Sequence, residues 1–318
     1  MKKYLLPFLF FAASSMLHAQ NSVQYKILSD EPMRACNFAM GVELAQMDFG
    51  FRNIDGLSFN TGVWGFADYK RLIGADFTLR YGYLTMGKTF RDKENLKAHR
   101  QIELGLYLPL SHRLVTAKNK IVLKVETSSN NTGGEVETTT FVMVPSTQFR
   151  SFGLRAGFMD FGGCLTMDDA ASEADFNLPD VVNYNVIGLY AGIYTEKMRS
   201  VLITTDNYGK KGTSLHSRFY LDAIIAPVSS VKYMDVDYKD KFSHSPIGAR
   251  MGIAWYPVLT RKEARPDFKG RRFLFQTEFG IRPYDGVFLT GTISIPISRH
   301  IAKLSDGSDK PVQQNETE

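Results

Sequence analysis

The sequence alternates between apolar and polar residues over segments of about ten to thirteen residues. In the clearest segment, 72–84, one face carries Ile73, Ala75, Phe77, Leu79, Tyr81 and Tyr83, and the other carries Gly74, Asp76, Thr78, Arg80 and Gly82. Successive side chains of a β-strand point to opposite faces of the sheet. The segment therefore predicts a strand with one apolar face and one polar face.

The same alternation recurs along most of the chain, in segments near residues 102, 152, 187, 219, 247, 273 and 287. Strands of soluble proteins average about five or six residues, whereas membrane-spanning strands need about nine to eleven. Beyond the N-terminus, no stretch reaches the roughly 18 apolar residues that a spanning helix needs. These lengths favour an all-β fold, a transmembrane antiparallel up-and-down β-barrel.

The segments give a count of fourteen strands, and an even number is expected of a bacterial barrel. Twelve is the alternative, reached if the two weakest segments, 198–205 and 230–238, are left out. The predicted strands lie at roughly 37–48, 57–69, 72–84, 99–111, 113–126, 135–144, 148–161, 185–195, 198–205, 214–226, 230–238, 246–256, 272–283 and 287–298.

Proline positions predict which ends of the strands share a rim. Proline cannot donate a hydrogen bond to the sheet, so it favours strand ends, edges and bulges. The prolines that fall near the ends of even-numbered predicted strands are Pro109, Pro145, Pro227, Pro257 and Pro296. This predicts a periplasmic rim with short turns at Lys70–Arg71, Ser111–His112 and Pro145–Thr147, and an outer rim with loops at 85–98, 127–134 and 162–184.

The N-terminal residues have the pattern of a secretory signal peptide. Lys2 and Lys3 precede an apolar run, and Leu17-His18-Ala19 supplies a cleavage site after Ala19. The expected layout is a signal peptide at 1–19, a short periplasmic leader at 20–36, the barrel at 37–298 and a polar, disordered tail at 299–318.

Charge and cysteine content narrow the classes of partner. The formal charge is +5, and the basic residues are spread along the chain without an arginine-rich arm, so no nucleic-acid partner is predicted. Cys36 and Cys164 lie at opposite rims of the predicted barrel, which favours two unpaired thiols over one disulfide. Their spacing matches no CxxC redox or zinc motif.

Several segments resemble outer-membrane β-barrel proteins of the Bacteroidota. They are the signal-peptide end Leu17-His18-Ala19-Gln20 and strands such as 151–158 and 247–257, with the sequences SFGLRAGF and IGARMGIAWYP. The resemblance implies location in the outer membrane and names a class rather than a family. The chain departs from many such barrels because some twenty polar residues follow Ile297, the end of its last predicted strand.

The polar strand faces define a candidate lumen. In one interpretation its acids and bases pair across the interior and make the barrel rigid, since an unpaired buried charge is costly. In the other they form a charged constriction that selects solutes. The candidate lumen charges are Asp76, Arg80, Glu103, Arg155, Arg218, Asp222, Arg250, Glu278 and Arg282.

A basic segment at 257–271 is longer than a periplasmic turn requires, and it is the candidate site for docking a partner. Its candidate contact residues are Arg261, Lys262, Arg265, Lys269, Arg271 and Arg272. Five carboxylates between Met167 and Asp180 lack EF-hand spacing, so a solvated loop is favoured over a Ca²⁺ site. His216 and Asp222 would lie about 20 Å apart along one strand, so they predict no catalytic pair.

These features predict a non-enzymatic outer-membrane barrel that is a structural or assembly partner of an envelope complex, with protein export as one candidate process. The alternative is a porin-like channel for small solutes, and a lipid-modifying enzyme has the least support. No cofactor or metal is predicted. The expected partners are outer-membrane lipid and envelope proteins on the periplasmic side.

Overall fold

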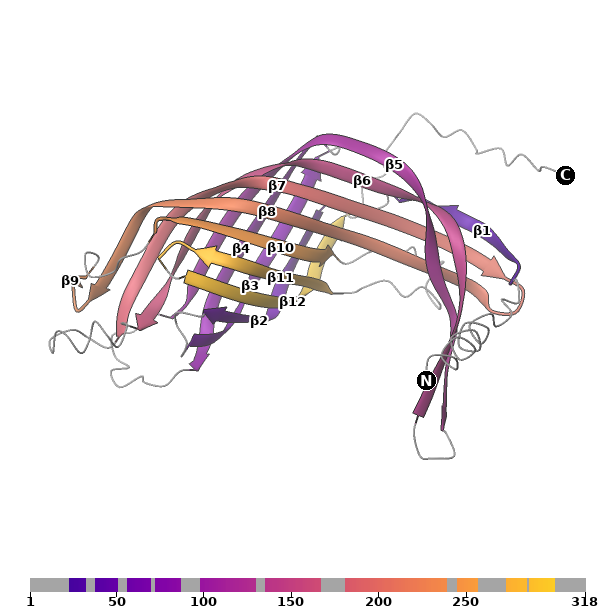
Figure 1. Cartoon of the computed structure of the whole chain (residues 1–318), viewed down its shortest axis with the longest axis horizontal. Coiled ribbons are helices and arrows are strands. Elements are labelled where there is room, and N and C mark those ends of the chain that lie inside the picture. The colour runs from indigo at the N-terminus through magenta and orange to yellow at the C-terminus, as the bar shows by residue number, and fades with distance from the viewer. Residues whose placement is uncertain are drawn as a thin grey trace, which may run out of the picture.

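The structure is a computed structural model. It describes residues 23–32, 38–50, 56–69, 72–86, 98–129, 135–166, 181–238, 245–256, 273–284 and 286–300. These residues form one antiparallel sheet of twelve strands (Figure 1). Within this part of the chain, no helix is long and apolar enough to cross a membrane.

The strands vary widely in length. They are β1 Tyr25–Asp30, β2 Phe38–Gly50, β3 Gly56–Tyr69, β4 Ile73–Met86, β5 Arg100–Ser129, β6 Glu135–Thr166, β7 Val181–Thr205, β8 Gly209–Tyr233, β9 Val236–Asp237, β10 Ile247–Tyr256, β11 Leu274–Arg282 and β12 Gly286–His300.

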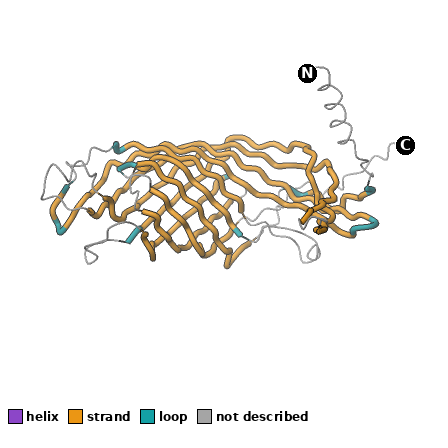
Figure 2. Tube along the Cα trace, turned by 60° about the horizontal axis from the view of Figure 1, so that its bottom comes forward, coloured by secondary structure: helices purple, strands orange, loops and turns teal. Residues whose placement is uncertain are grey.

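Ten of the strands close into a barrel, whose crossing front and back walls are visible in Figure 2. Each neighbour in the order β7-β6-β5-β4-β3-β2-β12-β11-β10-β8 is paired, and β8 pairs with β7 to complete the ring. The prediction of an all-β antiparallel barrel is confirmed. We call the rim where β2 begins and β12 ends the terminal rim.

The barrel has ten strands rather than the predicted fourteen or twelve. Strands β5, β6, β7 and β8 each run for 25 to 32 residues, and each unites two predicted strands. The expected turns at Ser111–His112 and Pro145–Thr147 therefore do not reverse the chain. The twelve strands of the whole sheet include β1 and β9, which lie outside the barrel ring.

The predicted number of strands was too high because prolines lie at bulges inside long strands as well as at strand ends. The register of β5 with β6 shifts between Pro109 and Ser111, and that of β12 with β2 shifts between Pro296 and Ser298. Pro227 is one of two residues of β8 that lie opposite the single residue Gly188 of β7, which forms another bulge. The residue left outside the pairing is Leu110 beside Pro109 and Ile297 beside Pro296, and in β8 it is Pro227 itself, with Ala226. Each proline therefore lies where the hydrogen-bond ladder is already interrupted.

Beyond the terminal rim, β5 and β6 separate from β7 and form a two-stranded arm, residues 116–129 and 135–147 (Figure 1). The pairing of β6 with β7 ends at Gln148 and Arg199, and β1 takes the place of β6 beside the end of β7. The Asp30 carboxylate accepts hydrogen bonds from the Thr147 N–H at 2.7 Å and the Thr147 hydroxyl at 2.8 Å. Asp30 therefore links β1 to the point where the strands diverge.

The arm has a small hydrophobic core of its own. Ile121 and Leu123 of β5 and Val144 of β6 pack with Val201 and Ile203 of β7, and side chains of β1 cover this cluster. An isolated hairpin is marginally stable in water, so this packing stabilises the arm. β1 lies inside the segment expected to be a leader, where no strand was predicted.

The outer face of the barrel is apolar around its circumference. The predicted apolar face of 72–84 points outward, and exposed side chains of other strands include Leu106, Leu154, Leu189 and Phe219. The polar face points inward, where Arg80 is buried. The two faces predicted from the alternation are thus the outside and the inside of the barrel.

The continuity of β5 and β6 can be tested by cross-strand disulfides. Thr116 and Thr147 are paired in the structure, whereas Leu108 pairs with Leu154. Paired Cα atoms lie about 4.5–5.5 Å apart, within reach of a disulfide. In a Cys36→Ser/Cys164→Ser background, we expect Thr116→Cys/Thr147→Cys to cross-link on oxidation.

The Leu108→Cys/Val115→Cys variant is the matched control, because a two-residue hairpin turn at Ser111–His112 would place those two residues directly opposite each other. Cross-linking of this control pair, measured by the shift on a non-reducing gel, would support the fourteen-strand arrangement and contradict the ten-strand barrel.

Candidate functional site

The predicted lumen charges all point into the barrel and lie close together. Eight of the nine are buried, and Asp76 is partly buried. The eight buried residues are Arg80, Glu103, Arg155, Arg218, Asp222, Arg250, Glu278 and Arg282. Because side chains alternate along each strand, these residues all lie on the inner face of the sheet. Closure of the barrel then brings residues of different strands together in the interior.

Arg250 lies at the centre of this network, with its side chain 1% exposed. It donates from Nε to Asp222 Oδ2 at 2.9 Å and from Nη1 to Glu103 Oε1 at 2.6 Å. Glu278 Oε1 lies 3.5 Å from the same Nη1. One guanidinium therefore joins carboxylates from three strands, β5, β8 and β11.

A second ion pair extends the network toward β2. Arg80 donates from Nε and Nη2 to the two carboxylate oxygens of Glu43, at 2.7 and 2.9 Å. Its Nη1 donates to Gln101 Oε1 at 3.2 Å, and Gln101 donates in turn to Glu103 Oε1 at 2.6 Å. The bidentate geometry is the strong form of the arginine–carboxylate pair.

Tyrosine rings fill the space between the arginines. The Arg155 guanidinium lies over the rings of Tyr220 at 4.0 Å and Tyr190 at 4.9 Å, and Arg218 lies over Tyr107 at 4.0 Å. Such cation–π contacts are favourable where the cation is desolvated. Tyr107 also donates to Asp76, and Tyr220 donates to Glu278.

Glycines on the inner face make room for these rings. A Cβ atom at Gly252 would lie 2.3 Å from Cζ of Tyr220, and one at Gly157 would lie 2.4 Å from the Tyr190 hydroxyl. Both distances are shorter than a van der Waals contact. Glycine and tyrosine on neighbouring strands are therefore complementary in shape.

Toward the terminal rim, a second group centres on Glu196. Its carboxylate accepts from Arg218 Nη2 at 3.0 Å and lies 2.8 Å from His216 Nε2. Arg218 also donates to the Tyr256 hydroxyl at 3.0 Å. His216 stacks on Tyr256, whose edge meets Phe66, so aromatic rings surround this group.

Toward the opposite rim, Arg282 forms a bidentate pair with Asp48, at 3.0 and 2.7 Å. His99, which precedes β5, lies 3.6 Å from the same carboxylate. Arg282 is therefore the cation that pairs directly with Asp48, and His99 is a more distant neighbour of that carboxylate.

The other sequence predictions have different outcomes. All six basic residues of the predicted docking segment lie outside the described residues, between the end of β10 and the start of β11. Cys164 lies in β6 opposite Asn183, but Cys36 is not among the described residues, so their pairing stays a prediction. In the described part of the chain, no group of three or more His, Cys, Asp or Glu residues could hold a metal ion.

Several members of the interior network were not predicted from the sequence. Glu43, Asp48 and Glu196 are the carboxylates that pair with Arg80, Arg282 and Arg218. Their inward-facing positions follow from the strand alternation. The bulge in β2 between Glu43 and Gln46 interrupts the alternation of that strand. Glu43 and Asp48, which both lie in β2, could therefore not be assigned to a face from the pattern.

The sequence was compared with protein families and with curated proteins. No family model matches the sequence, and no curated protein matches it. The geometry of the barrel is therefore the basis for the proposed function.

The network predicts that Arg250 is important for stability. Arg250→Ala leaves Glu103 and Asp222 buried with fewer partners, and loss of one member of a buried pair costs about 3–5 kcal/mol. We expect a loss of that size in the free energy of unfolding, measured with urea in lipid vesicles.

Arg100→Ala is the matched control. Arg100 pairs with Asp160 on the outer surface with its side chain 47% exposed, and an exposed pair contributes about 0–1 kcal/mol. Equal losses in the two variants would contradict a buried network around Arg250.

Proposed function

We propose that the chain is an exported, non-enzymatic outer-membrane β-barrel that anchors a β-sheet module for assembly with envelope proteins. The observation that carries this proposal is the filled interior: eight of the nine predicted lumen charges are buried, and Arg250 contacts carboxylates from three other strands. A barrel filled in this way supplies a rigid wall rather than a route for solutes.

The outer surface supports placement in a membrane. Apolar side chains point outward from β2 to β12, as in transmembrane barrels, which carry an outward apolar band flanked by aromatic residues. Tyr81 and Tyr83 lie toward the opposite rim, while Trp255 and Phe275 face each other toward the terminal rim. The signal-peptide pattern of residues 1–19 agrees with export.

A small-solute channel has less support. Interior width grows with strand number, and ten strands enclose less space than the fourteen first expected. Arg250, Tyr220 and Arg155 fill the middle of this space with contacts to partners on several strands. The barrel does close completely, which a channel would require, but the described interior is occupied.

The region beyond the terminal rim supports the assembly role. The arm has its own core and an exposed face that carries Phe141, 42% exposed, beside Met143 and Lys120. Spanning the membrane does not require this extension, because the apolar belt lies on the barrel. An exposed face on a rigid extension of the wall suits a partner on the side of the chain termini, which we place in the periplasm.

Photo-crosslinking tests the assembly role. With p-benzoylphenylalanine in place of Phe141, irradiation of cells that contain the full chain is expected to give a discrete protein adduct. The same group in place of Leu189, on the apolar belt, is the matched control and is expected to give lipid adducts. No protein adduct from the arm, or identical products at both positions, would contradict the proposal.

A further inference from the structure

Three cations lie side by side on the outer face of the sheet, just beyond the apolar belt. Arg113 of β5 pairs in register with Arg150 of β6, which pairs with Lys197 of β7. We call these residues the basic row. Arg113 and Lys197 are exposed, and Arg150 is partly buried.

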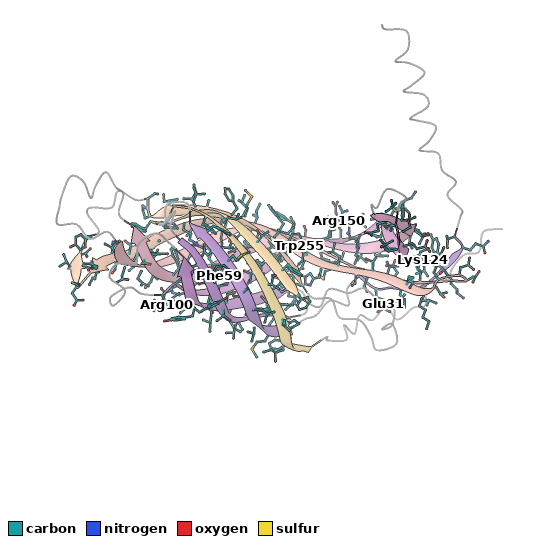
Figure 3. The ribbon with its side chains drawn as sticks, turned by 90° about the horizontal axis from the view of Figure 1, so that it is seen from below. Glu31, Phe59, Arg100, Lys124, Arg150 and Trp255 are labelled. Atoms are coloured by element: carbon teal, nitrogen blue, oxygen red, sulfur yellow. The ribbon has the colours of Figure 1, made fainter. Side chains whose placement is uncertain are left out.

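The position of the basic row is fixed by its neighbours. The row continues across the outer face through Ser217 to Trp255. Two residues nearer the middle of the barrel, about 7 Å along the strands, the outward positions include Phe152 and Phe219. The cations therefore lie where the apolar belt gives way to polar surface, toward the terminal rim. In Figure 3, Arg150 lies where the sheet extends beyond the barrel, away from Arg100.

No acidic side chain of the described residues pairs with the basic row. Arg150 donates from Nε to the neutral Gln148. The nearest carboxylate in sequence, Glu196, points to the interior and is bound by His216 and Arg218. Arg100, the outward cation toward the opposite rim, differs because it contacts Asp160 at 3.0 Å and Asn185 at 2.9 Å.

This arrangement has an electrostatic cost. Neighbouring strands lie about 4.8 Å apart, so the backbones that carry the three cations span about 10 Å across the sheet. Like charges directly opposite one another destabilise a sheet. An anion placed between the cations would relieve the repulsion, and the exposed guanidinium of Arg113 could bind a phosphate through two parallel hydrogen bonds.

We propose that the basic row binds the phosphate headgroups of anionic phospholipids in the membrane leaflet on the side of the chain termini. This inference rests on the proposed membrane placement, which puts lipid headgroups at the edge of the apolar belt. The belt holds the acyl chains, and the basic row holds the phosphates. Basic clusters at this position attract anionic lipids in membrane proteins.

Electron spin resonance of spin-labelled lipids tests the inference on the full chain in phosphatidylcholine vesicles. The motionally restricted fraction of a spin-labelled lipid measures its contact with the protein. We expect spin-labelled phosphatidylglycerol to be restricted more strongly than spin-labelled phosphatidylcholine, by roughly fivefold for a headgroup held by one cation. Added salt should reduce the difference through screening.

The charge-removing variant is Arg113→Gln/Arg150→Gln/Lys197→Gln, which should lose the preference for phosphatidylglycerol. Arg113→Lys/Arg150→Lys preserves the charge and should keep it. Arg100→Gln is the matched control at the opposite rim and should also keep it. This pattern would support the basic row as the lipid site.

Two results would overturn the inference, and they are distinguishable. Restricted lipid with no preference for phosphatidylglycerol, or with a preference unchanged in the triple variant, rejects the basic row but leaves the membrane placement intact. No restricted lipid of either kind, with a correctly folded barrel, rejects the membrane placement and the inference with it.

Discussion

Pairing of charges inside the barrel is the constraint on which the rest of the structure depends. A charge in a low-dielectric interior is tolerated only with partners of good geometry, and Arg250 meets carboxylates from three other strands. An eight-stranded barrel is just wide enough for side chains to fill. Ten strands are slightly wider, so the interior is filled by the long side chains of Arg, Tyr and Glu.

The same strands serve two environments. Within the barrel, the outer face is apolar and the inner face is polar. Beyond the basic row the outer face changes character, because Val201 and Ile203, on the outward-facing positions of β7, are buried under the arm. The outer face of the sheet therefore changes from an exposed apolar wall to a packed surface without a break in β7. The unbroken strands β5 and β6 join the arm directly to the barrel wall, which suits the proposed role in assembly.

Much of this fold could be predicted from local sequence, because the alternation of a strand is a property of adjacent residues. The inward position of Arg155, Asp222 and Arg250 follows from it directly. The ion-pair partner of each residue does not follow from the alternation. Arg250 and Glu103, for example, are 147 residues apart and meet only when the barrel closes.

The predicted number of strands was wrong for a different reason. Pro109 and Pro227 break the alternation at bulges, and in sequence a bulge with proline resembles a turn. β1 was missed because its six residues are too few for a clear alternating pattern. Its pairing with the end of β7 depends on the departure of β6, which is a tertiary event that the local sequence does not encode.

The central claim is that paired side chains close the interior, and single-channel recording of the refolded chain in a planar bilayer tests it most directly. The filled network around Arg250 predicts a correctly folded barrel that inserts and gives no steady conductance over a range of voltages. A steady, ion-selective conductance would contradict the account. It would show that the buried pairs leave a continuous path and would support the small-solute channel instead.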